Sequence, residues 1–141
     1  MTDRSQRVWV VAASAIRDGS VGAAVLLKDG NGRCVGSWQS RTSATSPEQG
    51  ALLAIVEGLR QAKANQAREV TVLCPFPQLT SRLNRHSPTS WNEPLARLWA
   101  LARARSHSFA TCAFQDIDAA RARGVIRMAA TSAEPALAKA A

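Results

Sequence analysis

The chain has 141 residues, 46% of them hydrophobic and 20% charged, which indicates one folded domain and excludes a largely disordered chain. Its 18 Lys and Arg against 10 Asp and Glu give a net charge of +8, and this surplus favours polyanionic partners. Three cysteines without a CxxC spacing exclude a disulfide framework, and no apolar run is long enough to span a membrane, so we expect reduced thiols in a cytoplasmic protein.

Hydrophobic patterning predicts three antiparallel strands at the beginning of the chain. The first is the apolar run Val8–Ala13, which is separated by the turn-like segment Arg17–Ser20 from a second run, Val21–Lys28. Apolar runs of this length, bounded by turn residues, are typical of strands. The Asp-Gly-Asn-Gly segment at 29–32 is a strong hairpin signal, and Arg33–Gln39 is the expected partner strand.

The clearest helix start lies at residues 46–49. Ser46 can cap the helix, Pro47 suits its first position and Gln49 completes a capping box, and the apolar spacing continues to about Asn65. The elements expected next are a strand over 69–74, a short helix over 78–85, a helix over 91–105, a strand over 108–114 and a helix over 118–130. We therefore expect one domain over residues 1–130 and a flexible Ala-rich tail over 131–141.

This order of elements resembles the ribonuclease H-like superfamily. The best local match is segment 41–59, RTSATSPEQGALLAIVEGL, in which a Thr-rich loop precedes a helix that begins with an acid. The resemblance extends over about Val8–Ala130. It implies an α/β fold with a mixed five-stranded sheet, three antiparallel strands first, flanked by helices on both faces.

The resemblance also implies where catalytic carboxylates belong. Ribonuclease H chemistry uses clustered acids to hold two divalent metal ions, because Mg²⁺ prefers oxygen ligands. The four corresponding positions hold Ala13 (or Ala12, if the alignment slips by one residue), Glu48, Pro75 and Arg123. Three of them lack a carboxylate, so we expect no catalytic residue, no metal ligand and no cofactor.

Two basic groups are candidates for nucleic-acid contact. The loop over 41–46 offers a guanidinium and hydroxyls beside a helix N-terminus, which suits phosphate groups. The later helices are rich in arginine, and Trp91 could stack on a base. The expected nucleic-acid-binding residues are Arg41, Thr42, Ser43, Thr45, Arg82, Arg85, Trp91, Arg97, Arg103 and Arg105.

Three hypotheses of function follow. The first is a catalytically inactive ribonuclease H-like protein that binds RNA, single-stranded DNA or a hybrid through phosphate contacts. The second is a regulatory module on the same fold, with a protein partner or a second copy as its ligand. The third is a nuclease dependent on Mg²⁺ or Mn²⁺, with a rearranged site formed by Glu48, Asp116 and Asp118. Asp118 is alternatively suited to cap the last helix.

Overall fold

The computed structural model describes residues 7–84 and 93–134. Its elements follow one another in the order strand, strand, strand, helix, strand, helix, helix, strand, helix, as the sequence predicts. They are β1 (Arg7–Arg17), β2 (Ser20–Asp29), β3 (Cys34–Thr42), α1 (Pro47–Ala64), β4 (Glu69–Cys74), α2 (Pro77–Leu83), α3 (Glu93–Ser106), β5 (Thr111–Asp116) and α4 (Arg123–Ala133). No helix within these residues is both long enough and apolar enough to cross a membrane.

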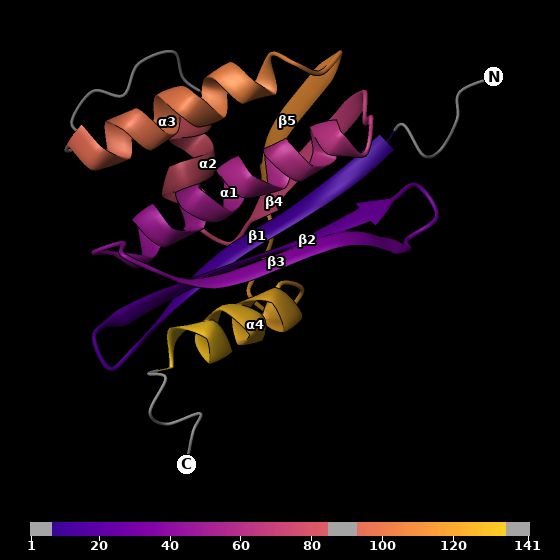
Figure 1. The fold of residues 1–141 in the computed structure, drawn as a ribbon. Coiled ribbons are helices and arrows are strands. Elements are labelled where there is room, and N and C mark those ends of the chain that lie inside the picture. The colour runs from indigo at the N-terminus through magenta and orange to yellow at the C-terminus, as the bar shows by residue number, and fades with distance from the viewer. Residues whose placement is uncertain (1–6, 85–92, 135–141) are drawn as a thin grey trace.

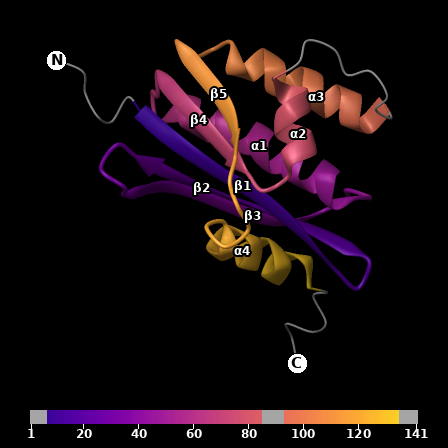
Figure 2. The same ribbon diagram turned by 180° about the vertical axis from the view of Figure 1, so that it is seen from behind.

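The five strands form one mixed sheet with the order β3-β2-β1-β4-β5. The first three strands are antiparallel, whereas β4 and β5 run parallel to β1. Helices α1, α2 and α3 lie on one face of the sheet and α4 lies on the other (Figure 1). Figure 2 shows the same arrangement from behind, with β5 at the edge of the sheet. The predicted α/β fold is therefore confirmed.

Each face of the sheet has its own apolar core, because successive side chains of a strand point to opposite faces. On the α1 side, Val10 and Ala12 of β1 pack with Leu52 and Ile55. On the α4 side, the alternate residues of β1 pack against α4, in a cluster formed by Val11, Ala13, Ala24, Val125 and Ala129. The central strand is thus buried on both faces.

Two glycines allow the helices to approach the sheet closely. A Cβ atom at Gly22 would lie 2.0 Å from the backbone oxygen of Ala129, and one at Gly58 would lie 2.4 Å from Cγ1 of Val10. Both distances are far below a van der Waals contact. The absence of a side chain at these positions therefore sets the spacing between β2 and α4, and between α1 and β1.

The first strand is longer than the predicted Val8–Ala13, because it continues to Arg17. The polar Ser14 appeared to end the apolar run, but its hydroxyl donates a hydrogen bond to the carbonyl of Pro47, so it is tolerated inside the fold. The hairpin then turns through Asp18 and Gly19, both with positive φ (49° and 79°), as a two-residue Asp-Gly hairpin turn requires.

The predicted beginning of the last helix is wrong. That helix, α4, begins at Arg123, and its N-cap, Ala122, makes no side-chain capping bond. Asp118 instead accepts a hydrogen bond from the backbone N–H of Arg121 at 2.8 Å, in a turn that precedes the helix. The helix continues to Ala133, three residues beyond the expected domain boundary. The rest of the expected tail, over 135–141, lies outside the described residues.

Candidate nucleic-acid interface

The fold places the four positions that the resemblance assigns to catalytic carboxylates at the same end of the sheet, with Ala13 on the face covered by α4 and Glu48 on the helix that covers the other face. Parallel pairing of β1 with β4 ends at Val11 and Leu73, and Ala13 and Pro75 each follow two residues later. The hydrogen bond from Ser14 to the Pro47 carbonyl holds the beginning of α1, and with it Glu48, at the same end of the sheet. The beginning of α4 is close by, since Ala13 and Val125 share a core cluster.

Three of these four positions offer no oxygen ligand from a side chain. Ala13 is completely buried in the core beneath α4, and Pro75 joins β4 to α2. Arg123 is the exposed first residue of α4. Two of the positions where the resemblance implies carboxylates therefore hold apolar groups, and a third holds a cation, which repels metal ions.

Glu48, the one acid that remains, is used in a contact between helices. It lies in the first turn of α1, where a carboxylate interacts favourably with the helix dipole. Its Oε1 accepts a hydrogen bond of 3.0 Å from Nε2 of Gln78, in the first turn of α2. Glu48 thus links the N-terminal ends of two helices.

The acids of the rearranged-site hypothesis each have a different partner. Asp116 accepts a hydrogen bond from the hydroxyl of Thr80, and Asp118 lies 3.8 Å from Nε of Arg121. Within residues 7–84 and 93–134, no group of three or more His, Cys, Asp or Glu side chains is placed to hold a metal ion. The described structure therefore does not assemble the cluster that this hypothesis needs.

The predicted loop over 41–46 is shorter in the structure, because its first two residues belong to a strand. Arg41 and Thr42 belong to β3, and the Arg41 guanidinium donates a hydrogen bond of 2.9 Å to Oγ of Ser20. The Thr42 hydroxyl donates to the carbonyl of Val21 at 3.0 Å. Ser43 is exposed. Arg41 and Ser43 are therefore the candidates in this segment that best reach solvent.

Helix capping fixes this segment. The Ser46 hydroxyl accepts a hydrogen bond of 3.2 Å from the backbone N–H of Gln49, as predicted. The Gln49 side chain does not close the predicted capping box, since its Oε1 accepts from the backbone N–H of Thr45 at 3.0 Å. It also accepts from the Thr45 hydroxyl. Thr45 is therefore engaged within the protein, although it is exposed.

Two of the arginines of α3, Arg103 and Arg105, connect helices more than they present charge. Arg103 donates a hydrogen bond of 2.8 Å to the carbonyl of Leu83 and lies 5.9 Å from the centre of the Trp99 ring. Arg105 donates to the carbonyl of Val56 at 3.2 Å. Both side chains are only partly exposed. These contacts tie α3 to α2 and α1, which the sequence pattern did not reveal.

The other candidates differ in exposure. Arg97 is exposed and Arg82 is half-buried, whereas Arg85 and Trp91 lie outside the described residues. Trp99 is buried, and its Nε1 donates a hydrogen bond of 2.8 Å to the carbonyl of Arg82. The structure thus places Arg41 and Ser43 beside the beginning of α1, and Arg97 on α3.

Two of the three cysteines, Cys74 and Cys112, are shielded by the fold. Burial raises the pKa of the Cys74 thiol to about 12 and that of Cys112 to about 11. Both thiols are therefore protonated near neutral pH and unreactive as nucleophiles. Cys34 is exposed, and all three cysteines are free, as expected.

Comparisons with known proteins agree with this architecture. The model of a family described as "Reverse transcriptase-like" matches residues 11–136. The N-terminal RNase H domain of Rv2228c from Mycobacterium tuberculosis, solved as a fusion with maltose-binding protein, superposes with a TM-score of 0.86 at 17% identity, over 96% of this chain and 99% of that chain. RNase H1 from Halobacterium salinarum superposes with a TM-score of 0.76 at 16% identity, over 90% of this chain and 99% of that chain.

A third solved structure is LC11-RNase H1 in complex with an RNA/DNA hybrid. It superposes with a TM-score of 0.81 at 12% identity, over 92% of this chain and 99% of that chain. The comparison of the sequence with curated proteins finds no match. At these identities the solved structures establish the shared fold, and the family match extends over most of the chain.

Proposed function

Because this chain belongs to the reverse transcriptase-like family and has the ribonuclease H-like fold, we propose that it binds nucleic acid through backbone phosphates and does not cleave it. The ligand is RNA, single-stranded DNA or an RNA/DNA hybrid. The proposal rests on one observation above all. The chain has the ribonuclease H-like fold, yet Ala13, Pro75 and Arg123 stand at three of the positions where the resemblance implies catalytic carboxylates.

The chemistry of cleavage requires these carboxylates. Two metal ions activate the attacking water and stabilise the leaving oxygen, and only oxygen-rich sites hold them. Mg²⁺ or Mn²⁺ would be the implied metal, and the residues present do not fit it, because Glu48 alone supplies a carboxylate among the four positions. Arg123 would instead attract a phosphate group directly.

Charge and relatives support the choice of ligand. The net charge of +8 favours binding to a polyanion, mostly through contacts that carry no sequence information. LC11-RNase H1 and a foamy viral protease-reverse transcriptase were both solved in complex with an RNA/DNA hybrid. A hybrid is therefore the first ligand to test, with Arg41, Ser43 and Arg97 as the contact candidates.

The proposal is tested at Arg41, which is exposed at the end of β3. Arg41→Gln should weaken binding of a labelled hybrid and lower its salt dependence by about one phosphate contact. Arg33→Gln, an exposed arginine in the β2–β3 turn, is the matched control and should bind as the unchanged protein does. Equal binding by the two variants would remove Arg41 from the interface.

A further inference from the structure

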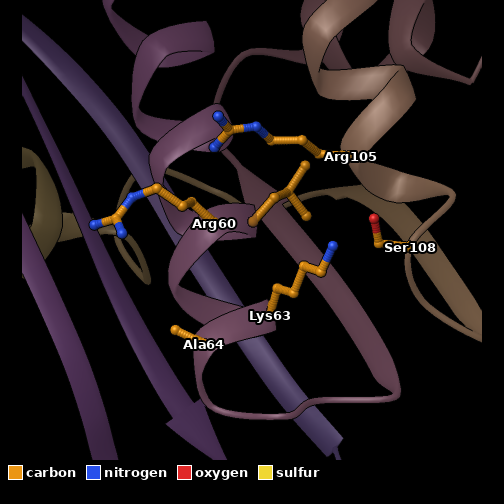
Figure 3. Close-up of a pocket in the computed structure, with 6 residues that line it drawn as sticks. Arg60, Lys63, Ala64, Arg105 and Ser108 are labelled. Carbon is orange, nitrogen blue, oxygen red and sulfur yellow. The ribbon is translucent and has the colours of Figure 1, made fainter.

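A second basic site lies away from the segment at the beginning of α1 that presents Arg41 and Ser43. A pocket of about 440 Å³ opens between the C-terminal turns of α1 and α3 (Figure 3). Lys63 in its wall lies fifteen residues after Glu48 along α1, which corresponds to about 22 Å of helix. The residues that line the pocket are Leu59, Arg60, Lys63, Ala64, Arg105 and Ser108.

The pocket carries excess positive charge. Three of its lining residues, Arg60, Lys63 and Arg105, are cations, and the neighbouring acid is Glu57. Arg60 forms an ion pair with Glu57, and this hydrogen bond lowers the pKa of the Glu57 carboxyl. The charge of Arg60 is thereby largely offset by Glu57, which interacts more weakly with Arg105, and Figure 3 shows the Arg60 guanidinium turned away from Lys63 and Ser108. Lys63 and Arg105 remain to attract an anion.

The donors of the pocket are held in place and available. The bond from Arg105 to the Val56 carbonyl fixes its side chain across α1 and leaves other guanidinium N–H groups unused. The Lys63 ammonium and the Ser108 hydroxyl have no side-chain partner within residues 7–84 and 93–134. The last carbonyls of α1 already accept hydrogen bonds from the backbone N–H groups of Asn65 and Gln66, so Lys63 is not needed to cap them.

The rest of the pocket is apolar. Leu59 and Ala64 contribute aliphatic surface, and the stem of Arg105 lines the same pocket. A guanidinium and its stem also stack on flat groups. The volume lies in the range of sites for small organic ligands, so a bare phosphate ion would leave much of it unfilled.

We propose that this pocket binds a phosphate monoester that carries a flat organic group, of the class of a nucleoside monophosphate. The phosphate is held by Lys63 and Ser108, which point toward each other in Figure 3, Arg105 adds positive charge to the same pocket, and the flat group rests against Leu59 and Ala64. The same chemistry is offered by a free nucleotide and by the phosphorylated end of an oligonucleotide. The site does not depend on the interface around Arg41.

Calorimetric titration with adenosine 5′-monophosphate tests the proposal. The unchanged protein should bind the nucleotide saturably, and more tightly than adenosine or inorganic phosphate, each of which lacks one half of the ligand. Lys63→Gln should weaken binding about fivefold, as loss of one partly exposed charge contact implies. Lys28→Gln, an exposed lysine on β2, should leave it unchanged.

Ser108→Ala provides a second variant with little risk to folding and should also weaken nucleotide binding. The absence of saturable binding, or equal affinity in Lys63→Gln and Lys28→Gln, would overturn the proposal. Arg41→Gln should retain nucleotide binding, so that failure here and failure of the proposed function can be distinguished.

Competition identifies the source of the phosphate. A short oligonucleotide with a 5′-phosphate that displaces the nucleotide would assign the pocket to strand ends, whereas no displacement would assign it to the free nucleotide. Displacement by a 5′-hydroxyl oligonucleotide that is equally strong would contradict the role given to the phosphate.

Discussion

Replacing Gly22 by alanine should loosen the contact between α4 and the sheet. The new Cβ would lie 2.0 Å from the Ala129 oxygen and 2.6 Å from the Ala133 nitrogen. Both are backbone atoms that no rotamer change can move, so α4 must retreat from β2 by more than about 1 Å. Overpacking of this kind costs about 3 kcal/mol of unfolding free energy, the upper end of its usual range.

A matched glycine makes the test specific. Gly124 has nothing within 4 Å of its Cβ direction and lies inside α4, so Gly124→Ala should stabilise the protein by about 0.5 kcal/mol through helix propensity. Urea unfolding followed by tryptophan fluorescence measures both variants, with stability read from the linear extrapolation. If Gly22→Ala were as stable as the unchanged protein, the close contact of α4 with β2 would be refuted.

Two further predictions concern titratable groups. Ellman's reagent should modify the exposed Cys34 in the native protein and should react with the other two cysteines only after unfolding, because burial raises the pKa values of Cys74 and Cys112 to about 12 and about 11. The ion pair with Arg60 lowers the pKa of Glu57 from 4.5, so its contribution to stability is complete above pH 4.5 and is lost as pH falls below it. The unchanged protein should therefore begin to unfold at a pH no higher than that at which Arg60→Gln begins to unfold. If the unchanged protein unfolded at a higher pH than the variant, the pairing would be contradicted.

The sequence predicted the elements that local signals specify. The Ser-Pro start of α1, the Asp-Gly-Asn-Gly turn and the apolar runs of β1, β2 and β4 are patterns within a few residues of one another, and each of these elements is present, although β1 extends beyond its predicted end. The order of these elements was enough for the fold class, since few topologies accommodate three antiparallel strands followed by two that are reached through helices.

Long-range contacts account for the failures. The length of β1 depends on Ser14, whose hydroxyl reaches a carbonyl 33 residues away. Arg105 resembled a surface charge, yet it donates to a carbonyl 49 residues away on α1. The same side chain lines a pocket together with Lys63, which no sequence spacing indicates. Asp118 has a side chain suited to a helix cap, but it accepts a hydrogen bond from the backbone N–H of Arg121 in the turn before α4, so it does not cap that helix.

The lack of carboxylates at three of the four positions could be inferred from the sequence, because that inference depends on the resemblance alone. What could not be predicted is how the neighbouring acids are engaged. Glu48 binds Gln78, and Asp116 accepts from Thr80. These contacts depend on how α2 packs against α1 and β5, which local sequence does not encode.

The most direct test of the central claim is one binding assay on hybrid, single-stranded and duplex probes, with and without Mn²⁺, in which each probe is also inspected for cleavage. We predict binding that weakens about 100-fold between about 50 and 200 mM salt, as contact with about four phosphates implies, and probes that stay intact. Cleavage that requires Mn²⁺, or no binding at the lowest salt, would contradict the proposal that this chain is a nucleic-acid-binding protein without nuclease activity.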